Sequence, residues 1–287
     1  MPYTVPYSFS VFYDNINLSG DHRSIANTRR DDIVTKLSKS FDVIESFSTG
    51  SVPKYTALKN HADLDVMVAL HYGKHIKDKK PSELLQDVRK CLAEWRTGVR
   101  RNGQAVTLHY ATWPNVDIVP VSRFTNADGS FSHYEVPDST NETWIKSRPT
   151  TLASDIKAKS NECGANFRRI IKMVKHWNRK HSSYLQSYHI EVLALRTLRG
   201  DLTDLPWHIY KFFEDARELL NSYVWYDVGF ADDYLSFSDR VEAKKRFDTA
   251  ISVSRAAWAK TYGEDDDHQS AIELWRQLFG SEFPAYG

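Results

Sequence analysis

The chain has 287 residues, of which 41% are hydrophobic and 26% charged, and its formal net charge at pH 7 is +1. This near balance excludes a general attraction to nucleic acid or to an anionic membrane, and no apolar run approaches the roughly 20 residues that span a bilayer. Its 2 cysteines exclude a disulfide framework and a multi-cysteine zinc site. We therefore expect a cytoplasmic monomer with no membrane contact and no stable nucleic-acid partner.

The first clear element along the chain is a helix over residues 25–41, where apolar side chains recur at helical spacing. After it comes the pair Gly50-Ser51, followed by VPKYTAL at 52–58. We expect 52–58 to be helical, because Pro53 is tolerated in a first helical turn. Gly50 lets the backbone approach a ligand closely. Ser51 can offer its hydroxyl and nearby amides to a triphosphate at the helix N-terminus.

Residues 63–70 have the apolar character of a buried strand. Asp63 and Asp65 are two residues apart, so a strand projects both carboxylates to the same face. Asp117, in the second predicted strand at 116–121, adds a third carboxylate. Three such charges resist joint ionisation unless cations are present. The trio therefore predicts a site for two Mg²⁺ ions, which Mn²⁺ can replace, of the kind that serves phosphoryl displacement.

The rest of the chain separates into two parts. Before residue 150 we expect a second amphipathic helix at 82–99, a strand at 106–110, and a hairpin turn at 126–130. Beyond it, strand signals fade and helical patterns dominate, at 162–180, 187–199, 206–221, 238–261 and 268–279. We expect an α+β catalytic core over 1–150 and a helical nucleotide-binding domain over 151–287, with the active site in the cleft between them.

In the helical part, cations share one predicted helix face. Arg168, Lys172, Lys175 and Arg179 fall at positions i, i+4, i+7 and i+11. Taken alone, this pattern is typical of a solvated cationic face. Beside a triphosphate site it also suits phosphate contact, because lysine is a good point-charge partner for phosphate.

The run at residues 50–70, GSVPKYTALKNHADLDVMVAL, resembles the signature of the DNA polymerase β-like nucleotidyltransferase superfamily. Later segments narrow the resemblance to the CD-NTase family, the bacterial cGAS/DncV-like nucleotidyltransferases of antiphage signalling, with the CdnE-like branch as the candidate within it. One departure is residues 226–229, where relatives often have Asp-Pro. The matching segments are Asp117-Ile118-Val119-Pro120, Trp144-Ile145 with Pro149, residues 169–178, Ser187-Tyr188-His189-Ile190-Glu191, Leu278-Phe279-Gly280 and Phe283-Pro284.

The resemblance implies a polymerase β-like core with a mixed β-sheet, followed by an α-helical domain. It also implies roles for individual residues. Asp63 and Asp65 would hold both metal ions, and Asp117 would hold the catalytic ion and help to deprotonate the nucleophile. Further contacts to the substrate are implied for Lys175 on phosphate, with Lys172 beside it, for Ser187 on phosphate, and for Tyr188 stacked on a base.

The reaction implied by the resemblance joins ATP, GTP, UTP or CTP into a cyclic di- or trinucleotide messenger, releases pyrophosphate, and reaches a downstream effector through the product. One alternative is a linear transferase acting on RNA, a small molecule or a protein. Another is a nucleotide-binding scaffold without activity, against which the intact aspartate trio argues.

Base choice depends on a more local feature. Asn166 precedes the cationic helix face, and its amide carries donors and an acceptor that can pair with a base edge such as that of uracil. One branch of the family uses an Asn in this region to favour uracil. Asn161 is a competing candidate, and Asn166 can also act only as a helix cap.

Overall fold

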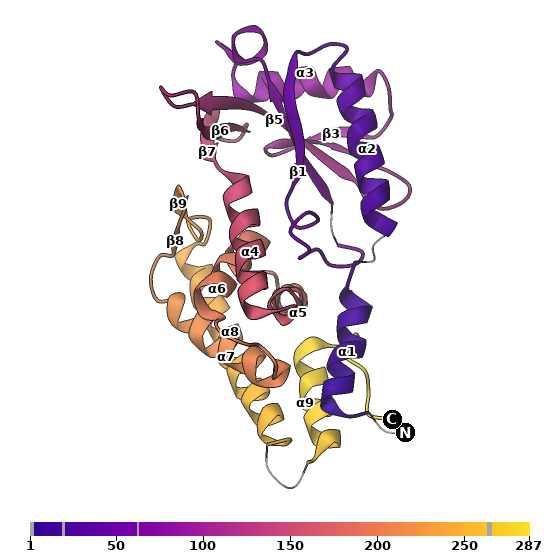
Figure 1. Ribbon diagram of the computed structural model, residues 1–287, viewed down its shortest axis with the longest axis vertical. Coiled ribbons are helices and arrows are strands. Elements are labelled where there is room, and N and C mark those ends of the chain that lie inside the picture. The colour runs from indigo at the N-terminus through magenta and orange to yellow at the C-terminus, as the bar shows by residue number, and fades with distance from the viewer. Residues whose placement is uncertain (1–2, 19–20, 62, 263–265) are drawn as a thin grey trace. The chain divides into compact units, whose positions relative to one another are not determined.

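The computed structural model describes residues 3–18, 21–61, 63–262 and 266–287 (Figure 1). The chain divides into two compact units. The sheet unit comprises Leu18–Tyr55 and Asn60–Thr151, and the helical unit comprises Met1–Asn17, Thr56–Lys59 and Leu152–Gly287.

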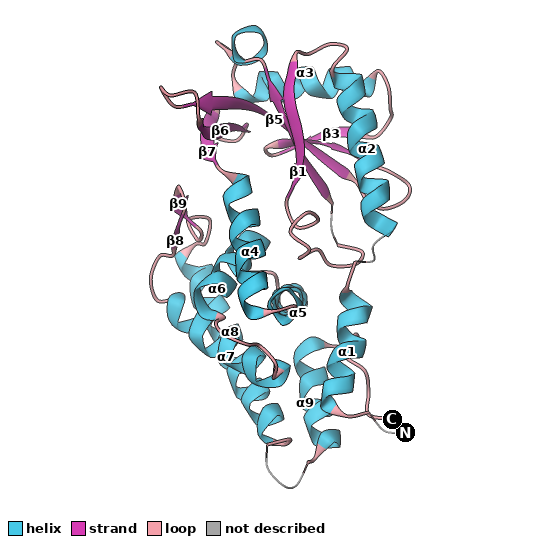
Figure 2. Cartoon of the chain, viewed as in Figure 1, coloured by secondary structure: helices cyan, strands magenta, loops and turns pink. Residues whose placement is uncertain are grey.

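The sheet unit carries all but two of the labelled strands (Figure 2). Its sheet has the order β1-β2-β5-β4-β3, with β6 beside β5 and β7 beside β6. The elements are α2 (Asp21–Leu37), β1 (Val43–Thr49), β2 (Leu64–Leu70), the π-helix η1 (Tyr72–Ile76), α3 (Pro81–Ala93), β3 (Val99–Asn102), β4 (Ala105–Leu108), β5 (Val116–Thr125), β6 (Phe131–Asp138) and β7 (Thr143–Ser147).

The sheet is mixed, because β2 and β5 run parallel while the other neighbours are antiparallel. A parallel pair needs a long crossover connection, and the segment that contains α3 supplies it. The predicted turn at 126–130 joins β5 to β6, as expected. The parallel pairing brings the starts of β2 and β5 to the same edge of the sheet.

The two faces of β2 are buried in different ways. Met67 and Ala69 belong to a small apolar cluster with Val121 of β5 and with residues of β6. Leu64 and Val66 alternate with them and are almost completely buried. The helices α2 and α3 contact the sheet strands and each other, and neither contributes to the Met67 cluster. The helices therefore cover the Leu64 face, and the face of the aspartates is the opposite one.

The helical unit contains α1 (Val5–Ile16), most of α4 (Pro149–Cys163), α5 (Asn166–Lys180), α6 (Ser187–Thr197), α7 (Leu205–Leu219), α8 (Phe237–Ala259) and α9 (His268–Phe279), together with the hairpin of β8 (Trp225–Tyr226) and β9 (Gly229–Phe230). A continuous apolar core joins these helices. Phe9 of α1 is fully buried in it and packs edge-to-face on Trp275 and Phe283.

The structure differs from the sequence-based expectations in three places. Residues 52–55 form turns, and 52–58 contains no helix, so the expected helix after Gly50-Ser51 is wrong. The helices α1 and α4 were not anticipated. Residues 3–17 and 56–59 pack with the helical unit, although the predicted boundary at 150 assigned them to the catalytic core. Apolar side chains on one face of α1 explain its place, since they are buried among the C-terminal aromatic residues.

Among the described residues, no helix is long and apolar enough to cross a membrane.

Candidate active site

The predicted aspartates lie at one edge of the mixed sheet. Asp65 is the second residue of β2, and Asp63 immediately precedes that strand. In the parallel pair, Asp65 is in register with Asp117 of β5. Asp63 is exposed, whereas Asp65 is half-buried. The sheet therefore brings the three carboxylates together from segments that are more than 50 residues apart in the chain.

Burial and mutual repulsion disfavour the ionised form of these groups. Burial raises the pKa of Asp65 to about 7, and the negative charges of Asp117 and Asp63 add to the rise. Burial also raises the pKa of Asp117, against a hydrogen bond from Thr107 that lowers it. Carboxylates held in this way are stabilised by a nearby cation.

Thr107 is a site residue that the sequence analysis missed. It lies on β4 directly opposite Asp117, and its hydroxyl donates a hydrogen bond to Asp117 Oδ1. This bond orients the carboxylate. No sequence signal identifies Thr107, because its partner is set by the register of the β4–β5 pair.

Gly50 lies against Asp65. It follows the last residue of β1, Thr49, which is in register with Asp65, and its φ of +72° is in the left-handed region. A Cβ atom at position 50 would lie 1.8 Å from Asp65 Oδ2. Glycine is therefore required both by the turn and by the space that the carboxylate occupies. Ser51 comes next in the turn and is half-buried.

We expect Gly50→Ala to abolish most activity while the fold persists, because the new methyl group must displace the Asp65 carboxylate. Strain at positive φ adds roughly 1 kcal/mol of destabilisation. Gly129→Ala is the matched control, since Gly129 has φ of +82° and a Cβ at that position would meet no atom within 4 Å. Turnover rates and melting temperatures of both variants are measured together. An equal loss of activity in Gly50→Ala and Gly129→Ala would contradict this assignment.

The donor set suits a hard divalent cation. All three carboxylates offer oxygen ligands, and the raised pKa of Asp65 shows that the positive charge of Lys54 does not offset burial and the charge of Asp117. No group of three or more His, Cys, Asp or Glu within the described ranges is already arranged around one point as a metal cage. Mg²⁺ usually keeps waters and substrate phosphates as ligands beside one or two carboxylates, so a site for it need not be closed by protein groups alone.

The predicted cationic face of α5 is solvated only in part, because Arg179 is exposed and Arg168 half-buried while the two lysines are buried. Lys172 and Lys175 are only 4% and 3% exposed. Lys175 Nζ lies 2.6 Å from Glu191 Oε1 of α6 and 3.1 Å from Thr56 Oγ1. Lys172 donates to Asn17 Oδ1. In this structure both ammonium groups are bonded inside the helical unit, and their predicted contact with phosphate stays a prediction.

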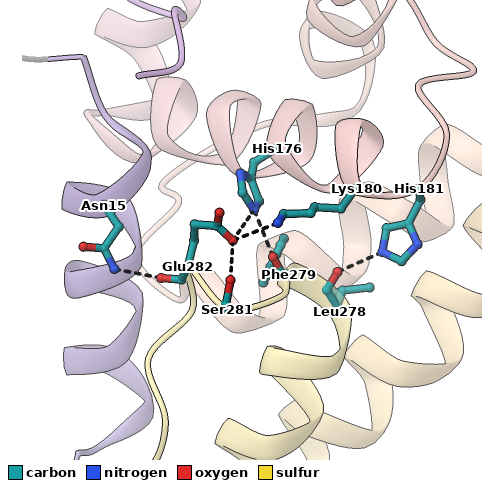
Figure 3. A network of polar contacts seen from close by, with 8 residues as sticks. All are labelled: Asn15, His176, Lys180, His181, Leu278, Phe279, Ser281 and Glu282. Atoms are coloured by element: carbon teal, nitrogen blue, oxygen red, sulfur yellow. Dashed lines mark hydrogen bonds and ion pairs between the residues drawn. The ribbon is translucent and has the colours of Figure 1, made fainter. Parts of the chain in front are cut away.

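Lys180 and two histidines at the C-terminal end of α5 contact the segment 278–282 (Figure 3). His176 Nε2 lies 2.9 Å from the carbonyl oxygen of Phe279, and His181 Nε2 lies 3.0 Å from that of Leu278. Lys180 forms a 3.1 Å ion pair with Glu282, whose own carbonyl accepts a hydrogen bond from Asn15 of α1. These contacts hold α1, α5 and the C-terminal segment together, which is a structural role.

Ser187 and Tyr188 form the first turn of α6 and are both exposed. The Tyr188 ring packs edge-to-face on Tyr226 of β8, with ring centroids 6.1 Å apart. Although part of the ring is exposed, partial desolvation and the negative charges of Asp227 and Asp233 raise the pKa of Tyr188 to about 12, so its hydroxyl stays protonated at neutral pH. An exposed ring held from one side is free on the other to stack on a base.

His189, the next residue of α6, is fully buried and pairs with the hydroxyl of Tyr234 at 3.0 Å. Burial lowers its pKa to about 4, whereas the unfolded chain takes up this proton near pH 6.5. Between these values the unfolded state binds more protons. The contribution of His189 to the stability of the fold is therefore complete above pH 6.5 and is lost as the pH falls to about 4.

We expect the unfolding free energy of the wild type to fall by up to about 3 kcal/mol across this window on account of His189. His189→Gln removes the titration and flattens the dependence, while His71→Gln, at an exposed position, leaves it unchanged. Urea unfolding followed by tryptophan fluorescence at pH 4, 5, 6 and 7 measures the difference. Parallel curves for the wild type and His189→Gln would contradict the assignment.

Asn166 begins α5, and its amide is bonded at both ends. Nδ2 donates to the carbonyl oxygen of Leu202 at 2.7 Å, and Oδ1 accepts from Arg169 at 3.2 Å. The N-cap position is Ala165, without a side-chain cap, so Asn166 is not the cap that the alternative interpretation proposed. Asn161 is exposed near the end of α4. Base selection by either residue stays a prediction.

Comparison with known families gives one match that covers more than half of the chain. The model of the Second Messenger Oligonucleotide or Dinucleotide Synthetase domain matches residues 3–160. The match includes Gly50, Ser51 and the three aspartates.

Individual relatives cover nearly the whole chain at low identity. A probable cyclic nucleotide synthase of Bacillus cereus (strain VD146) is 22% identical, over 96% of this chain and 97% of the relative. The cyclic AMP-AMP-AMP synthase of Acinetobacter sp. (strain ATCC 27244 / 9458) is 23% identical, over 92% and 80%.

Among solved structures, that of E. coli MS115-1 CdnC with ATP has a TM-score of 0.75 and 19% identity, over 97% of this chain and 98% of that one. The likeness confirms the predicted fold class, a polymerase β-like core with a mixed sheet followed by a helical domain.

Proposed function

Since this chain belongs to the Second Messenger Oligonucleotide or Dinucleotide Synthetase family, we propose that it joins nucleoside triphosphates into a cyclic di- or trinucleotide and releases pyrophosphate. The chain is a nucleotidyltransferase that makes cyclic oligonucleotides with the help of a divalent metal ion. Mg²⁺ is the ion we propose, with Mn²⁺ as a substitute, because the three donors are carboxylates.

The observation that carries the proposal is the register of Asp65 with Asp117 beside Gly50. It places carboxylates next to a backbone turn in which a side chain at position 50 would collide with Asp65. A catalytic role explains why the chain keeps mutually repelling, partly buried carboxylates there. A scaffold has no use for them, because they cost stability without a cation.

We propose the following roles for the residues of the trio. Asp63 and Asp65 would hold both ions, and Asp117 would hold one of them. When bound, two Mg²⁺ ions neutralise phosphate charge and lower the pKa of the attacking ribose hydroxyl. Thr107 keeps the Asp117 carboxylate oriented, and Asp117 would accept the hydroxyl proton as the oxygen attacks the α-phosphorus.

The substrate is held by groups outside the trio. We propose that Ser51 and the backbone amides around Gly50 bind the triphosphate, that Ser187 and Lys175 contribute phosphate contacts, and that Tyr188 stacks on a base. ATP is a supported substrate, because one relative is a cyclic AMP-AMP-AMP synthase and the CdnC structure is of a complex with ATP. GTP, UTP and CTP complete the substrate class.

The biological setting follows from the family. We propose that the chain acts in the bacterial cytoplasm in antiphage signalling, as a monomer, and that its product reaches a separate effector protein. Placement in the CdnE-like branch stays a prediction.

The test is an incubation of the purified protein with labelled NTPs, singly and in pairs, with Mg²⁺ and with chelator. Phosphatase-resistant products are then identified by mass spectrometry. A cyclic product that requires metal supports the proposal. Products that keep a free 3′-end and lose their 5′-phosphates to phosphatase would instead establish the linear transferase.

A further inference from the structure

A groove in the helical unit lies between α4 and α6, which Figure 1 shows side by side. It is an open groove with a volume of about 410 Å³, and Tyr226 of β8 contributes to its lining. Ala158 and Leu195 contribute apolar lining, and charged side chains of both helices and of Arg199, which follows α6, also line it. The volume falls within the range of about 300–1,000 Å³ that is usual for ligand sites.

The positive charge of the groove comes mainly from two arginines. Arg196 Nη2 donates to the carbonyl oxygen of Trp225 at 2.8 Å, and Arg199 Nη2 donates to the carbonyl oxygen of Arg196 at 3.2 Å. Both side chains are exposed. Within the described residues the hydrogen bonds of both guanidinium groups go to neutral carbonyls and not to carboxylates. Each guanidinium is thus positioned, while its charge remains available to an anion.

The acidic side chains of the groove have partners of their own. Asp155 accepts a 2.6 Å hydrogen bond from the hydroxyl of Tyr226. Glu162 forms a 2.8 Å ion pair with Lys159. Lys159 and the two arginines outnumber Asp155 and Glu162 in the lining, so its net charge is positive, and both arginines lie at or just after the C-terminal end of α6.

The groove is continuous with the proposed base-stacking residue through aromatic contacts. Tyr226, which lines the groove, is the ring on which Tyr188 packs. Tyr188 lies in the first turn of α6, Arg196 lies in its last turn, and Arg199 follows the helix by two residues, so the ring and the guanidinium groups lie at opposite ends of α6. Stacking surface at one end and guanidinium groups at the other match the chemistry of a nucleotide chain.

We propose that this groove is a second nucleoside-phosphate site, in which Arg196 and Arg199 bind the phosphates of a nucleotide and Tyr188 and Tyr226 support its bases. The inference rests on the proposed function for the identity of the ligand. Two sources share this chemistry, a free NTP and a linear oligonucleotide with a 5′-triphosphate.

The test measures binding without turnover, in the Asp63→Asn/Asp65→Asn background and with chelator. The probes are ATP and a 5′-triphosphorylated adenosine dinucleotide, each titrated by calorimetry. Arg199→Glu should weaken binding about tenfold or more, since it replaces a charge-assisted contact by repulsion. Arg199→Lys, which keeps the charge but not the planar fork, should fall between Arg199→Glu and the parent.

Lys157→Glu is the matched control. Lys157 is also exposed, it lies on α4, and it does not line the groove. Its substitution changes net charge by the same amount as Arg199→Glu and should leave both affinities within a factor of about two. Equal melting temperatures for the two variants exclude unfolding as the cause of a difference.

Each outcome decides the inference. Weaker binding of the dinucleotide alone in Arg199→Glu identifies the oligonucleotide as occupant, and equal weakening of ATP identifies the mononucleotide. Unchanged affinity of Arg199→Glu for both probes contradicts the groove as a binding site. If Tyr188→Ala abolishes binding in the same assay, the proposed function remains supported. Binding that depends on Arg199 in a protein that forms no product would instead overturn the proposed function and keep the groove.

Discussion

Replacing Asp63 and Asp65 together by Asn is expected to lower kcat/KM for nucleotide transfer by about a thousandfold or more. The charge stabilisation that bound metal ions supply is worth several kcal/mol, and each 1.36 kcal/mol is a factor of ten in rate. The same loss should follow when the wild type is assayed in excess chelator. Initial rates of pyrophosphate release with and without Mg²⁺ measure both effects.

The fold should survive this double substitution. Asp65 is a half-buried carboxylate whose pKa is raised to about 7 by burial and by the neighbouring charge of Asp117, so removing its charge should leave the unfolding free energy in chelator unchanged or slightly higher. Asp78→Asn is the control. Asp78 is exposed on the sheet unit, and its φ of +64° suits Asn as well as Asp. Normal turnover by the double variant would contradict the assignment of Asp63 and Asp65 as metal ligands.

The second large effect concerns the buried pair of Lys175 and Glu191. Their side chains are 4% and 1% exposed, and Nζ lies 2.6 Å from Oε1. The hydroxyl of Thr56 completes the group by donating to Glu191. Removing one partner leaves a buried charge without compensation, so Lys175→Met should destabilise the protein by about 3–5 kcal/mol. This stabilising role differs from the phosphate contact that the family resemblance implies for Lys175.

A double-mutant cycle gives the sharper test. Lys175→Met with Glu191→Leu should cost much less than the sum of the single substitutions, because no buried charge then remains. The control is Lys245→Met, which removes an exposed ion pair with Glu242 on α8 and should change stability by about 0.5 kcal/mol or less. Additive effects of Lys175→Met and Glu191→Leu in urea unfolding would show that the pair is not coupled.

The cycle also separates the two roles considered for Lys175. If the double variant recovers stability but keeps a raised KM for NTP, Lys175 contacts phosphate during the reaction. If KM recovers with stability, the lysine acts by holding the segment 56–59 inside the helical unit. Either result assigns a role that sequence alone left open.

Several features could be derived from the sequence because they depend on local pattern. Strand alternation around Asp63 and Asp65 places two carboxylates on one face, and helical spacing locates most of the elements beyond residue 150. The expected helix at 52–58 failed, because Pro53 permits a helix start without requiring one. Burial of α1 was not anticipated, since its apolar face is matched by residues near the opposite end of the chain.

The sequence by itself determined the type of chemistry. A Gly-Ser turn, paired aspartates and a third aspartate indicate metal binding and phosphate binding even before the partners of these residues are known. The tertiary structure decided the partners. The register of β2 with β5 places Asp65 beside Asp117, and the register of β4 with β5 places Thr107 beside Asp117. Gly50 lies so close to Asp65 that a Cβ atom would collide with its carboxylate. The tertiary structure also decided that the Lys175 ammonium group is buried and bonded to Glu191. Helical periodicity gives the direction of a side chain but not whether another helix covers it, so only the packed structure distinguishes a solvated lysine from a buried ion pair.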